Sequence, residues 1–240
     1  EPYKVRKAIF LAAGFGSRLV PITFNTPKPL VRVHGTRIID TLLDAVLAAG
    51  ISDITIVRGY LSEQFDQLLY KYPMINFVEN PAYLESNNIS SALCVRYMFS
   101  NSYVFESDLY LINKSLITPY QYSSNYLGVK VDKTDDWSLK TDTKGRVTNI
   151  GLGGRDCYHM FGISHWSRSD GKKLAEHIKE TYEMPGGKER FWDQVALEYF
   201  ITEYNINVRE CSFNDIAEID TFEDLKKIDK TYECNTTAKG

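Results

Sequence analysis

The sequence predicts an α/β fold with a mixed, mostly parallel sheet and helices on both of its faces. Three observations support this prediction. Strand-like and helix-like segments alternate over residues 8–108, which is the pattern of successive β–α–β units. The first strand-like segment is an apolar run that ends in a glycine-rich loop, as expected for a buried parallel strand. Beyond residue 108 short strand-like segments replace the alternation, so we expect a small mixed subregion there.

The elements of the first half follow one another regularly. A helix over residues 38–49 is predicted by apolar residues at helical spacing, with Gly50 as its C-terminal stop. Short apolar runs on either side of the predicted helices read as buried strands. In chain order we expect a strand over 8–12, the helix over 38–49, a strand over 54–57, a helix over 61–70, a strand over 75–78, a helix over 89–99 and a strand over 103–106.

The second half is predicted to be mixed. Lys144-Gly145 marks a hairpin between two of its strands. A long amphipathic helix and two further helices are predicted by their apolar periodicity. In chain order we expect strands over 126–131, 138–141, 147–150 and 160–165, helices over 169–182 and 191–204, a strand over 208–212 and a helix over 221–232.

Composition and charge exclude several classes of protein. A net charge of −3 over 240 residues argues against general nucleic-acid binding. No apolar run approaches the roughly 18 residues that span a bilayer, so we expect no membrane insertion. The N-terminus is too polar for a secretory signal. Four cysteines without C-x-x-C spacing and four histidines without ligand spacing predict neither a disulfide framework nor a zinc site. We therefore expect a reduced, cytoplasmic protein.

Residues 11–31, LAAGFGSRLVPITFNTPKPLV, have the features of a triphosphate-binding loop. Gly14 and Gly16 lack side chains, so their amides can approach phosphate oxygens closely. Arg18 and Lys28 supply positive charge, and the prolines flanking Lys28 limit the entropy lost in orienting it. The plain alternative is a turn with surface charges, because Gly-x-Gly alone is a weak signal. Neither the dinucleotide pattern nor the Walker pattern is complete.

Taken whole, this segment resembles the signature of sugar-phosphate and related nucleotidyltransferases, L-x-A-G-x-G-x-R-L-x-P-x-T-x-x-x-P-K-P-L. Every fixed position of that signature is met. The resemblance implies a Rossmann-like nucleotidyltransferase fold. It places the backbone of residues 11–14 near the base and ribose, and Arg18 and Lys28 on the phosphates. The nucleotide-binding residues expected in the loop are Leu11, Ala12, Ala13, Gly14, Gly16, Ser17, Arg18 and Lys28.

Two acidic segments are candidates for metal binding. Asp108 and its neighbour Glu106 close the fourth predicted strand, and ligands of open α/β sheets bind beyond the carboxyl ends of strands. Asp220 lies near the end of the chain. The resemblance places a metal aspartate at each position, which implies Mg²⁺ on Asp108 and Asp220, with Glu106 among the nucleotide-binding residues. Asp108 could instead be a turn residue, and Asp220 the N-cap of the helix over 221–232.

The implied reaction is in-line nucleotidyl transfer. An acceptor phosphate or phosphonate oxygen attacks the α-phosphorus of a nucleoside triphosphate, and pyrophosphate leaves. Such chemistry depends on positioning and charge neutralisation more than on a protein nucleophile. We therefore expect Arg18, Lys28 and Asp108 to be the catalytic residues. No general base is needed, because the acceptor oxygen is already anionic.

A departure from the sugar branch narrows the resemblance. Residues 85–93, ESNNISSAL, replace the Pro-x-Gly-Leu-Ala segment usual before the third helix of sugar nucleotidyltransferases. This stretch is similar to the bacterial phosphocholine cytidylyltransferase branch, as are Asp136-Trp137, residues 191–193 and residues 218–220. The resemblance runs from about Lys7 to about Tyr232, and it implies CTP as the nucleotide.

The acceptor is expected in the second half of the chain. A quaternary ammonium is bound by aromatic faces with carboxylates nearby, and all three tryptophans lie in this half. Core packing is the alternative for each, above all for Trp166. Phosphocholine is the favoured acceptor, with 2-aminoethylphosphonate and phosphoethanolamine as rivals that would use the same carboxylates. The expected acceptor-binding residues are Asp136, Trp137, Trp192, Asp193, Glu218 and Tyr110.

Some questions stay open at this level. Either Asn87 or Asn88 could cap the helix that follows them, and the other could contact the base; Asn88 is the candidate for the contact. A sugar-1-phosphate nucleotidyltransferase and a non-catalytic nucleotide sensor are the weaker alternatives. We expect a single domain over 1–232, with a nucleotide-binding half (7–108) and an acceptor-binding half (109–232). Residues 233–240 read as a tail or as a linker to a further enzyme domain, and the oligomeric state is open.

Overall fold

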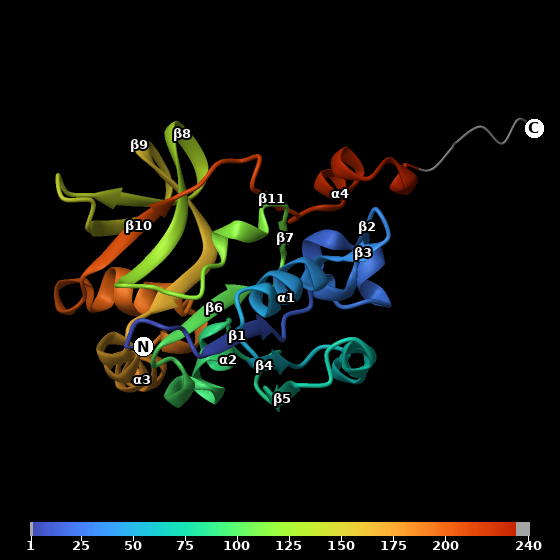
Figure 1. The fold of residues 1–240 in the computed structure, drawn as a ribbon, viewed down its shortest axis with the longest axis horizontal. Helices are drawn as coiled ribbons and strands as arrows, with labels where there is room; N and C mark the ends of the chain where they lie inside the picture. The colour runs from blue at the N-terminus through green and yellow to red at the C-terminus, as the bar shows by residue number, and fades with distance from the viewer. Residues whose placement is uncertain (1, 234–240) are drawn as a thin grey trace, which may run out of the picture.

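The computed structural model describes residues 2–233. Its centre is a seven-stranded sheet in the order β10–β8–β9–β6–β1–β4–β5 (Figure 1). Neighbouring strands pair in parallel except at β8–β9 and β9–β6. The predicted mixed, mostly parallel sheet is therefore confirmed. The strands are β1 Lys7–Ala12, β4 Asp53–Arg58, β5 Ile75–Glu79, β6 Ser102–Glu106, β8 Ser124–Thr141, β9 Val147–Trp166 and β10 Ile206–Glu210.

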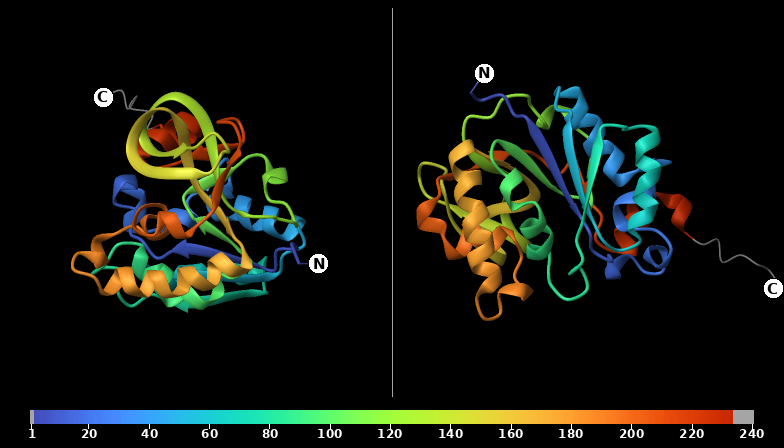
Figure 2. Two further views of the ribbon diagram at one scale, coloured as in Figure 1. Left: turned by 90° about the vertical axis from the view of Figure 1, so that its left-hand side faces the viewer. Right: turned by 90° about the horizontal axis from the view of Figure 1, so that it is seen from below.

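Helices cover both faces of this sheet. Alternate side chains of a strand point to opposite faces, so Phe10 of β1 packs with α1 (Ile38–Ala48) while Ile9 packs with α2 (Ile89–Cys94) and α3 (Arg168–Glu183). Figure 2 shows α1 above the sheet and α3 beneath it in its left view. Two apolar cores result, one on each face. The carboxyl ends of β1 and β6 lie between these two cores. The loop that follows β1 begins at this edge of the sheet.

Several predicted helices are shorter or tighter than expected. The spacing of apolar residues along a helix indicates which face is buried. Over a short segment it does not distinguish an α-helix from a 3₁₀ or π helix. Residues 62–70 form the 3₁₀ helix η4 (Ser62–Tyr70), and the helix expected over 89–99 is α2 followed by η5 (Arg96–Met98). The helix expected over 191–204 is reduced to the π-helix η8 (Val195–Tyr199) and η9 (Ile201–Glu203). The last helix is α4 (Phe222–Ile228) with η10 (Lys230–Tyr232).

The four short strands expected between residues 126 and 165 are two long ones, so that expectation was wrong. β8 has 18 residues and β9 has 20. The polar run 132–136 reads as a turn, yet it continues β8 where the pair curls away from the sheet (Figure 1). Irregular register there lets charged residues face solvent. The hairpin is confirmed: Lys144 and Arg146 donate backbone hydrogen bonds to Asp142 Oδ1, and Gly145 adopts φ +78°.

Two small sheets were not predicted, because strands of two or three residues carry little pattern. One joins β2 (Arg32–Val33) to β3 (Thr36–Arg37). The other joins β7 (Leu109–Leu111) to β11 (Ile216–Glu218) in antiparallel fashion. Glu218 is paired with Leu109, and the Ile219 amide donates to the Asp108 carbonyl at 3.3 Å. The second sheet therefore brings the two acidic segments of the chain side by side.

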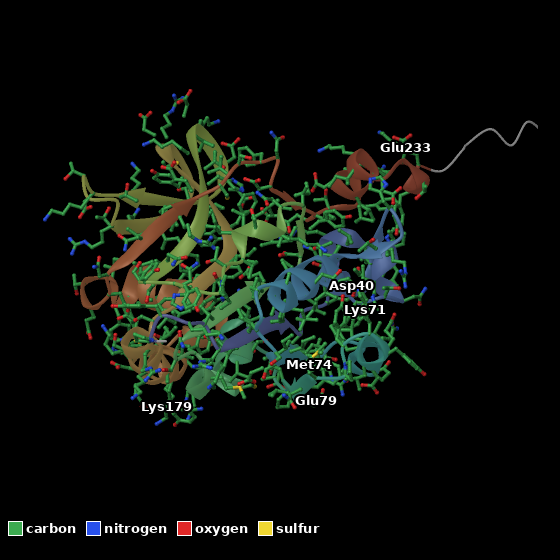
Figure 3. The ribbon with its side chains drawn as sticks, viewed as in Figure 1. Asp40, Lys71, Met74, Glu79, Lys179 and Glu233 are labelled. Atoms are coloured by element: carbon green, nitrogen blue, oxygen red, sulfur yellow. The ribbon has the colours of Figure 1, made fainter. Side chains whose placement is uncertain are left out.

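The remaining elements are short 3₁₀ turns, and most connect the larger elements. Figure 3 shows Lys179 of α3 and Glu233, the last residue described, at opposite ends of the molecule. Most of the tail expected over 233–240 lies outside the described residues. No helix among residues 2–233 is both long and apolar enough to cross a membrane. The short turns are η1 Ser17–Leu19, η2 Ile22–Phe24, η3 Lys28–Leu30, η6 Lys114–Leu116 and η7 Gly187–Glu189.

Candidate active site

The loop after β1 folds back over Lys28. Gly16 adopts φ +68°, and a Cβ at this position would lie 3.0 Å from Lys28 Cβ. Glycine is therefore required both by the left-handed backbone and by the close approach. The Thr23 hydroxyl donates to the Gly16 carbonyl at 3.0 Å and holds the return of the loop. The conformation of the loop thus places the Lys28 side chain directly beneath the glycine turn.

Lys28 is a buried cation shared by two carboxylates. The residue is 8% exposed. Its Nζ lies 3.0 Å from Asp108 Oδ2 and 2.9 Å from Asp220 Oδ1. Burial alone would lower the pKa of Lys28, but the charges of both aspartates outweigh it, so the pKa is raised. Arg18 adds a second cation, with Nη1 2.8 Å from Asp220 Oδ2, and its side chain is largely exposed.

The two aspartates that bind Lys28 belong to a cluster of three carboxylates. Asp108, Glu218 and Asp220 each present an oxygen, and these oxygens lie within 4.8 Å of one another. Asp108 Oδ1 is buried and has no hydrogen-bond partner in the described part of the chain. Burial and the charges of the neighbouring aspartates raise the pKa of Glu218, although the hydrogen bond from His159 opposes the shift. Asp220 is not a helix cap, because Thr221 caps α4 in a capping box. The cluster offers hard oxygen ligands of the kind that divalent cations take.

A first cavity of about 350 Å³ opens above this cluster. Of the loop residues expected at a nucleotide, Ser17 is exposed and does not line it. Asn80 follows β5 at the carboxyl edge of the sheet, where a ligand-binding residue could have been expected. Its side-chain amide donates to Ser90 Oγ at 2.9 Å and Ser91 Oγ at 3.0 Å. The expected residues in the lining are Leu11, Ala12, Ala13, Gly14, Gly16, Arg18, Lys28, Asn88, Glu106 and Asp108; those not anticipated include Pro29, Asn80, Tyr83, Ser86, Ser90, Ser91, Ser107 and Phe191.

Asn88 lines the first cavity with both ends of its amide engaged. Nδ2 donates to Glu106 Oε1 at 3.1 Å, and Oδ1 accepts the Trp192 amide at 2.9 Å. Neither end caps α2. Asn87 instead accepts the Asn88 amide and donates to the Glu189 carbonyl. Asn87 and Asn88 both line the first cavity, so the base contact of Asn88 stays a prediction, with both ends of its amide held by fixed partners.

Glu106 and Asp193 form a buried acid pair at the base of the first cavity. Burial raises the pKa of Asp193 to about 6, and burial together with the Asp193 charge raises the pKa of Glu106 well above its usual range. The Tyr126 hydroxyl donates to Asp193 Oδ1 at 2.6 Å. A Cβ on Gly162 would lie 2.7 Å from Glu106 Cγ, so glycine is needed there. Asp193, which we expected at the acceptor, is 4% exposed and lies under the first cavity instead.

A second cavity, of about 470 Å³, adjoins the first at Arg18. Asp136, His159 and Glu218 each present one atom to it, and these atoms lie within 4.8 Å of one another. The His159 ring centroid is 5.1 Å from that of Phe161 and 5.2 Å from that of Phe213. The cavity is therefore acidic on one side and aromatic on the other. Its lining comprises Arg18, Asp136, His159, Phe161, Phe213, Ile216, Ala217, Glu218, Asp220, Thr221 and Asp224.

Two aromatic residues expected at the acceptor line neither cavity. Trp192 is 1% exposed and packs in the core, with its ring centroid 5.9 Å from that of Trp166. Tyr110 packs on a separate apolar cluster beneath the loop. The expectation for Trp192 was wrong, because a residue's place in the sequence does not reveal which face of its element is covered. The expectation for Tyr110, which is half-buried, stays a prediction. Trp137 is half-buried and makes an edge-to-face contact with Phe191 at 5.4 Å, so it lies near the rim of the first cavity.

The sequence provided no signal for His159, Phe161 or Phe213. Each stands alone in its segment, without a motif. His159 and Phe161 follow one another on the same face of β9, and Phe213 comes from the loop between β10 and β11. Only the curl of β8 and β9 over the β7–β11 sheet brings them to Asp136 and Glu218.

Comparison with known proteins relates this arrangement to enzymes. A model of the family described as nucleotidyl transferase matches residues 7–112. The chain is 38% identical to the 2-aminoethylphosphonate cytidylyltransferase of Lancefieldella rimae over 94% of this chain and 92% of that protein. It is 34% identical to the choline-phosphate cytidylyltransferase of Streptococcus pneumoniae over 93% and 97%. The solved structure of the CTP:phosphocholine cytidylyltransferase from Streptococcus pneumoniae superposes with a TM-score of 0.87 at 33% identity, covering 95% of this chain and 99% of that one.

Proposed function

Because the chain belongs to the nucleotidyl transferase family and, within it, to the cytidylyltransferases that act on phosphoryl amines, we propose that it transfers CMP from CTP to 2-aminoethylphosphonate. Pyrophosphate is the second product, and Mg²⁺ is the proposed metal. The observation that supports this acceptor is the pair of carboxylates, Asp136 and Glu218, that face each other in the second cavity.

A primary ammonium suits this second cavity. It donates three hydrogen bonds, and charge-assisted bonds to carboxylates are short and strong. Asp136 and Glu218 are acceptors within reach of one such group. A quaternary ammonium has no N–H to donate and depends on aromatic faces. Of the tryptophans proposed for that purpose, Trp192 lies in the core. Phe161 and Phe213 also line this cavity, but the two carboxylates offer a primary ammonium the hydrogen bonds that a quaternary one cannot use. They therefore favour 2-aminoethylphosphonate over the phosphocholine that the sequence favoured.

Phosphocholine is the second candidate, and one observation favours it. The edge-to-face pair of Trp137 and Phe191 lies beside Asp136, and Phe191 lines the first cavity. Two adjoining rings could present faces to a methylated ammonium. The likeness to the choline-phosphate cytidylyltransferase of Streptococcus pneumoniae supports the same acceptor.

The residues for a divalent cation are Asp108 and Asp220, with Glu218 beside them. The fit is supported by Asp108 Oδ1, a buried oxygen with no hydrogen-bond partner among residues 2–233, and by the all-oxygen donor set. When bound, Mg²⁺ supplies Lewis-acid polarisation of phosphoryl oxygens. The chain itself supplies positive charge through Lys28 and Arg18 and orients the loop of residues 11–16.

The proposed transfer needs no protein nucleophile. A phosphonate oxygen of the acceptor forms a bond to the α-phosphorus of CTP, and the bond from that phosphorus to the bridging oxygen of pyrophosphate breaks, with its electron pair leaving on pyrophosphate. Lys28 and Arg18 stabilise the negative charge that develops on the phosphoryl oxygens. Asp136 and Glu218 hold the ammonium, so that the acceptor oxygen is oriented before reaction. The contribution of these residues is therefore positioning and charge.

Pyrophosphate release measured with CTP, Mg²⁺ and each acceptor in turn tests the proposal. We expect the highest kcat/KM with 2-aminoethylphosphonate, a lower value with phosphoethanolamine and phosphocholine, and no release with glucose 1-phosphate. A tenfold preference for phosphocholine would establish the second candidate instead. Release with the sugar phosphate alone would refute both candidates.

A pair of neighbouring variants tests the ammonium site. Asp136→Asn should raise KM for 2-aminoethylphosphonate by about tenfold or more, because asparagine keeps an acceptor oxygen but loses the negative charge that strengthens its bond to the ammonium. Asp135→Asn is the matched control, since the Asp135 side chain is 88% exposed and its ion-pair partner is Lys133. Equal KM values for the two variants would place the ammonium away from Asp136.

A further inference from the structure

His159 lies at the junction of the two carboxylates proposed to hold the acceptor ammonium. Its ring is nearly buried, on β9, and packs against the rings of both Phe161 and Phe213. Nδ1 lies 3.1 Å from the Thr134 hydroxyl of β8, and Nε2 lies 3.6 Å from Glu218 Oε2 of β11. The imidazole therefore bridges two elements that are distant in the sequence.

The partners of the ring determine which nitrogen carries the proton. A bare Nε2 facing a carboxylate oxygen would be repelled by it, so Nε2 carries the hydrogen in the neutral imidazole. Nδ1 is then an acceptor, and the Thr134 hydroxyl donates to it. That hydroxyl accepts the backbone amide of Asp136 at 3.1 Å. A chain of polar contacts thus runs from the Asp136 amide through Thr134 and His159 to the Glu218 carboxylate.

This chain connects the two acidic residues of the second cavity. Asp136 lies on the irregular, curled part of β8, where register shifts between Thr134 and Trp137 leave the backbone without regular sheet pairing. Glu218 lies on a strand of only three residues. Contacts made through Thr134 and His159 tie the backbone of Asp136 to the carboxylate of Glu218. The Asp136 carboxylate is in turn fixed by the Trp137 amide, which donates to its Oδ1 at 2.7 Å.

We propose that His159, together with Thr134, is a positioning residue for the acceptor: it holds Glu218 and Asp136 at the separation that one primary ammonium bridges. The inference rests on the proposed function of the second cavity. His159 need not touch the reacting atoms. Its effect is on acceptor binding, and through the geometry of the carboxylates it favours a primary over a quaternary ammonium.

His177 provides a matched control within the same chain. Its Nδ1 lies 2.7 Å from the Tyr204 hydroxyl and its Nε2 3.5 Å from Glu203 Oε2, so it repeats the hydroxyl–imidazole–carboxylate arrangement. It belongs to α3 and lines neither cavity. Loss of the His177 ring should therefore perturb packing without changing acceptor binding.

The test compares His159→Leu, Thr134→Val, Thr134→Ser and His177→Leu by steady-state pyrophosphate release, with circular dichroism to check folding. In His159→Leu we expect KM for 2-aminoethylphosphonate to rise about tenfold, with KM for CTP and kcat within about twofold of the wild type. Thr134→Val should raise the same KM severalfold, and Thr134→Ser, which keeps the hydroxyl, should restore it. KM for phosphocholine should change less, and His177→Leu should leave every KM unchanged.

Three results would overturn the inference: an unchanged acceptor KM in folded His159→Leu, an equal rise in KM for CTP, or Thr134→Ser as impaired as Thr134→Val. If His159→Leu fails to fold, the two Thr134 variants decide. If none of the phosphoryl amines supports pyrophosphate release by the wild-type protein, the proposed function is refuted, and the inference with it. A wild-type protein that is active while the variants match it would refute the inference alone.

Discussion

Replacing Lys28 with methionine should both destabilise the protein and make its stability more responsive to Mg²⁺. The substitution keeps most of the volume of the side chain and removes the ammonium that Asp108 and Asp220 share. Both aspartates are then left partly buried, beside Glu218 and close to each other. Arg18 still pairs with Asp220 from the solvent side, but no described side chain remains to pair with the Asp108 carboxylate.

The magnitude follows from the geometry. Two unit charges about 3 Å apart attract by about 5 kcal/mol at an effective dielectric constant of 20, and desolvation of the charges offsets much of this. Removing one partner of a buried ion pair costs about 3–5 kcal/mol, because the remaining charge stays buried. The Lys28 side chain is only 11% exposed, so little of this is lost to solvent screening. We expect the free energy of unfolding to fall by about 3 kcal/mol.

Urea unfolding followed by tryptophan fluorescence, with and without about 10 mM Mg²⁺, measures both effects. In the variant the carboxylates are free to bind the cation, whereas in the wild type the cation must displace the ammonium. Mg²⁺ should therefore stabilise Lys28→Met by more than it stabilises the wild type, although CMP transfer is lost.

Lys71→Met is the matched control: Lys71 lies 2.9 Å from Asp44 Oδ1 with its side chain half exposed, so its loss should cost less than about 1 kcal/mol. If the free energy of unfolding falls no further in Lys28→Met than in this control, the reasoning is refuted. If Mg²⁺ stabilises Lys28→Met and the wild type equally, the ammonium does not block the cation.

Three further predictions concern other residues. Asp220→Asn should abolish pyrophosphate release while α4 keeps its helicity by circular dichroism, since Thr221 and not Asp220 caps that helix; a loss of helix content would contradict this. Glu106 and Asp193 have raised pKa values in the folded protein, so the folded state binds more protons and stability declines as pH rises above about 4; the part due to Asp193 is complete once pH has passed its pKa of about 6. Glu106→Gln should flatten the decline in urea titrations at several pH values, and an unchanged slope would count against the pair. Trp192→Phe should lower the free energy of unfolding by about 1–3 kcal/mol, because the smaller ring leaves a cavity in the core, and should leave KM for every acceptor within about twofold; a tenfold rise in acceptor KM would return Trp192 to the site.

The order and type of most strands in the first half could be predicted from sequence alone. Buried parallel strands are continuous apolar runs, and β1, β4, β5 and β6 lie within a residue or so of the expected bounds. The curled pair β8 and β9 could not be predicted in this way. Their charged middle section resembles a turn, and only the three-dimensional path shows that a strand can leave the sheet and face solvent there.

What the sequence determined by itself was the reaction class, because the information for it is contiguous. Residues 11–31 form one loop whose glycines and cations serve one ligand, so the pattern is readable along the chain. Tertiary structure decided the acceptor side. Asp136, His159, Phe213 and Glu218 come from four separate segments, and the direction of each side chain depends on strand curl and packing. For the same reason Trp192 points into the core rather than into a cavity: local pattern specifies an element, but only the packing of elements specifies what its side chains face.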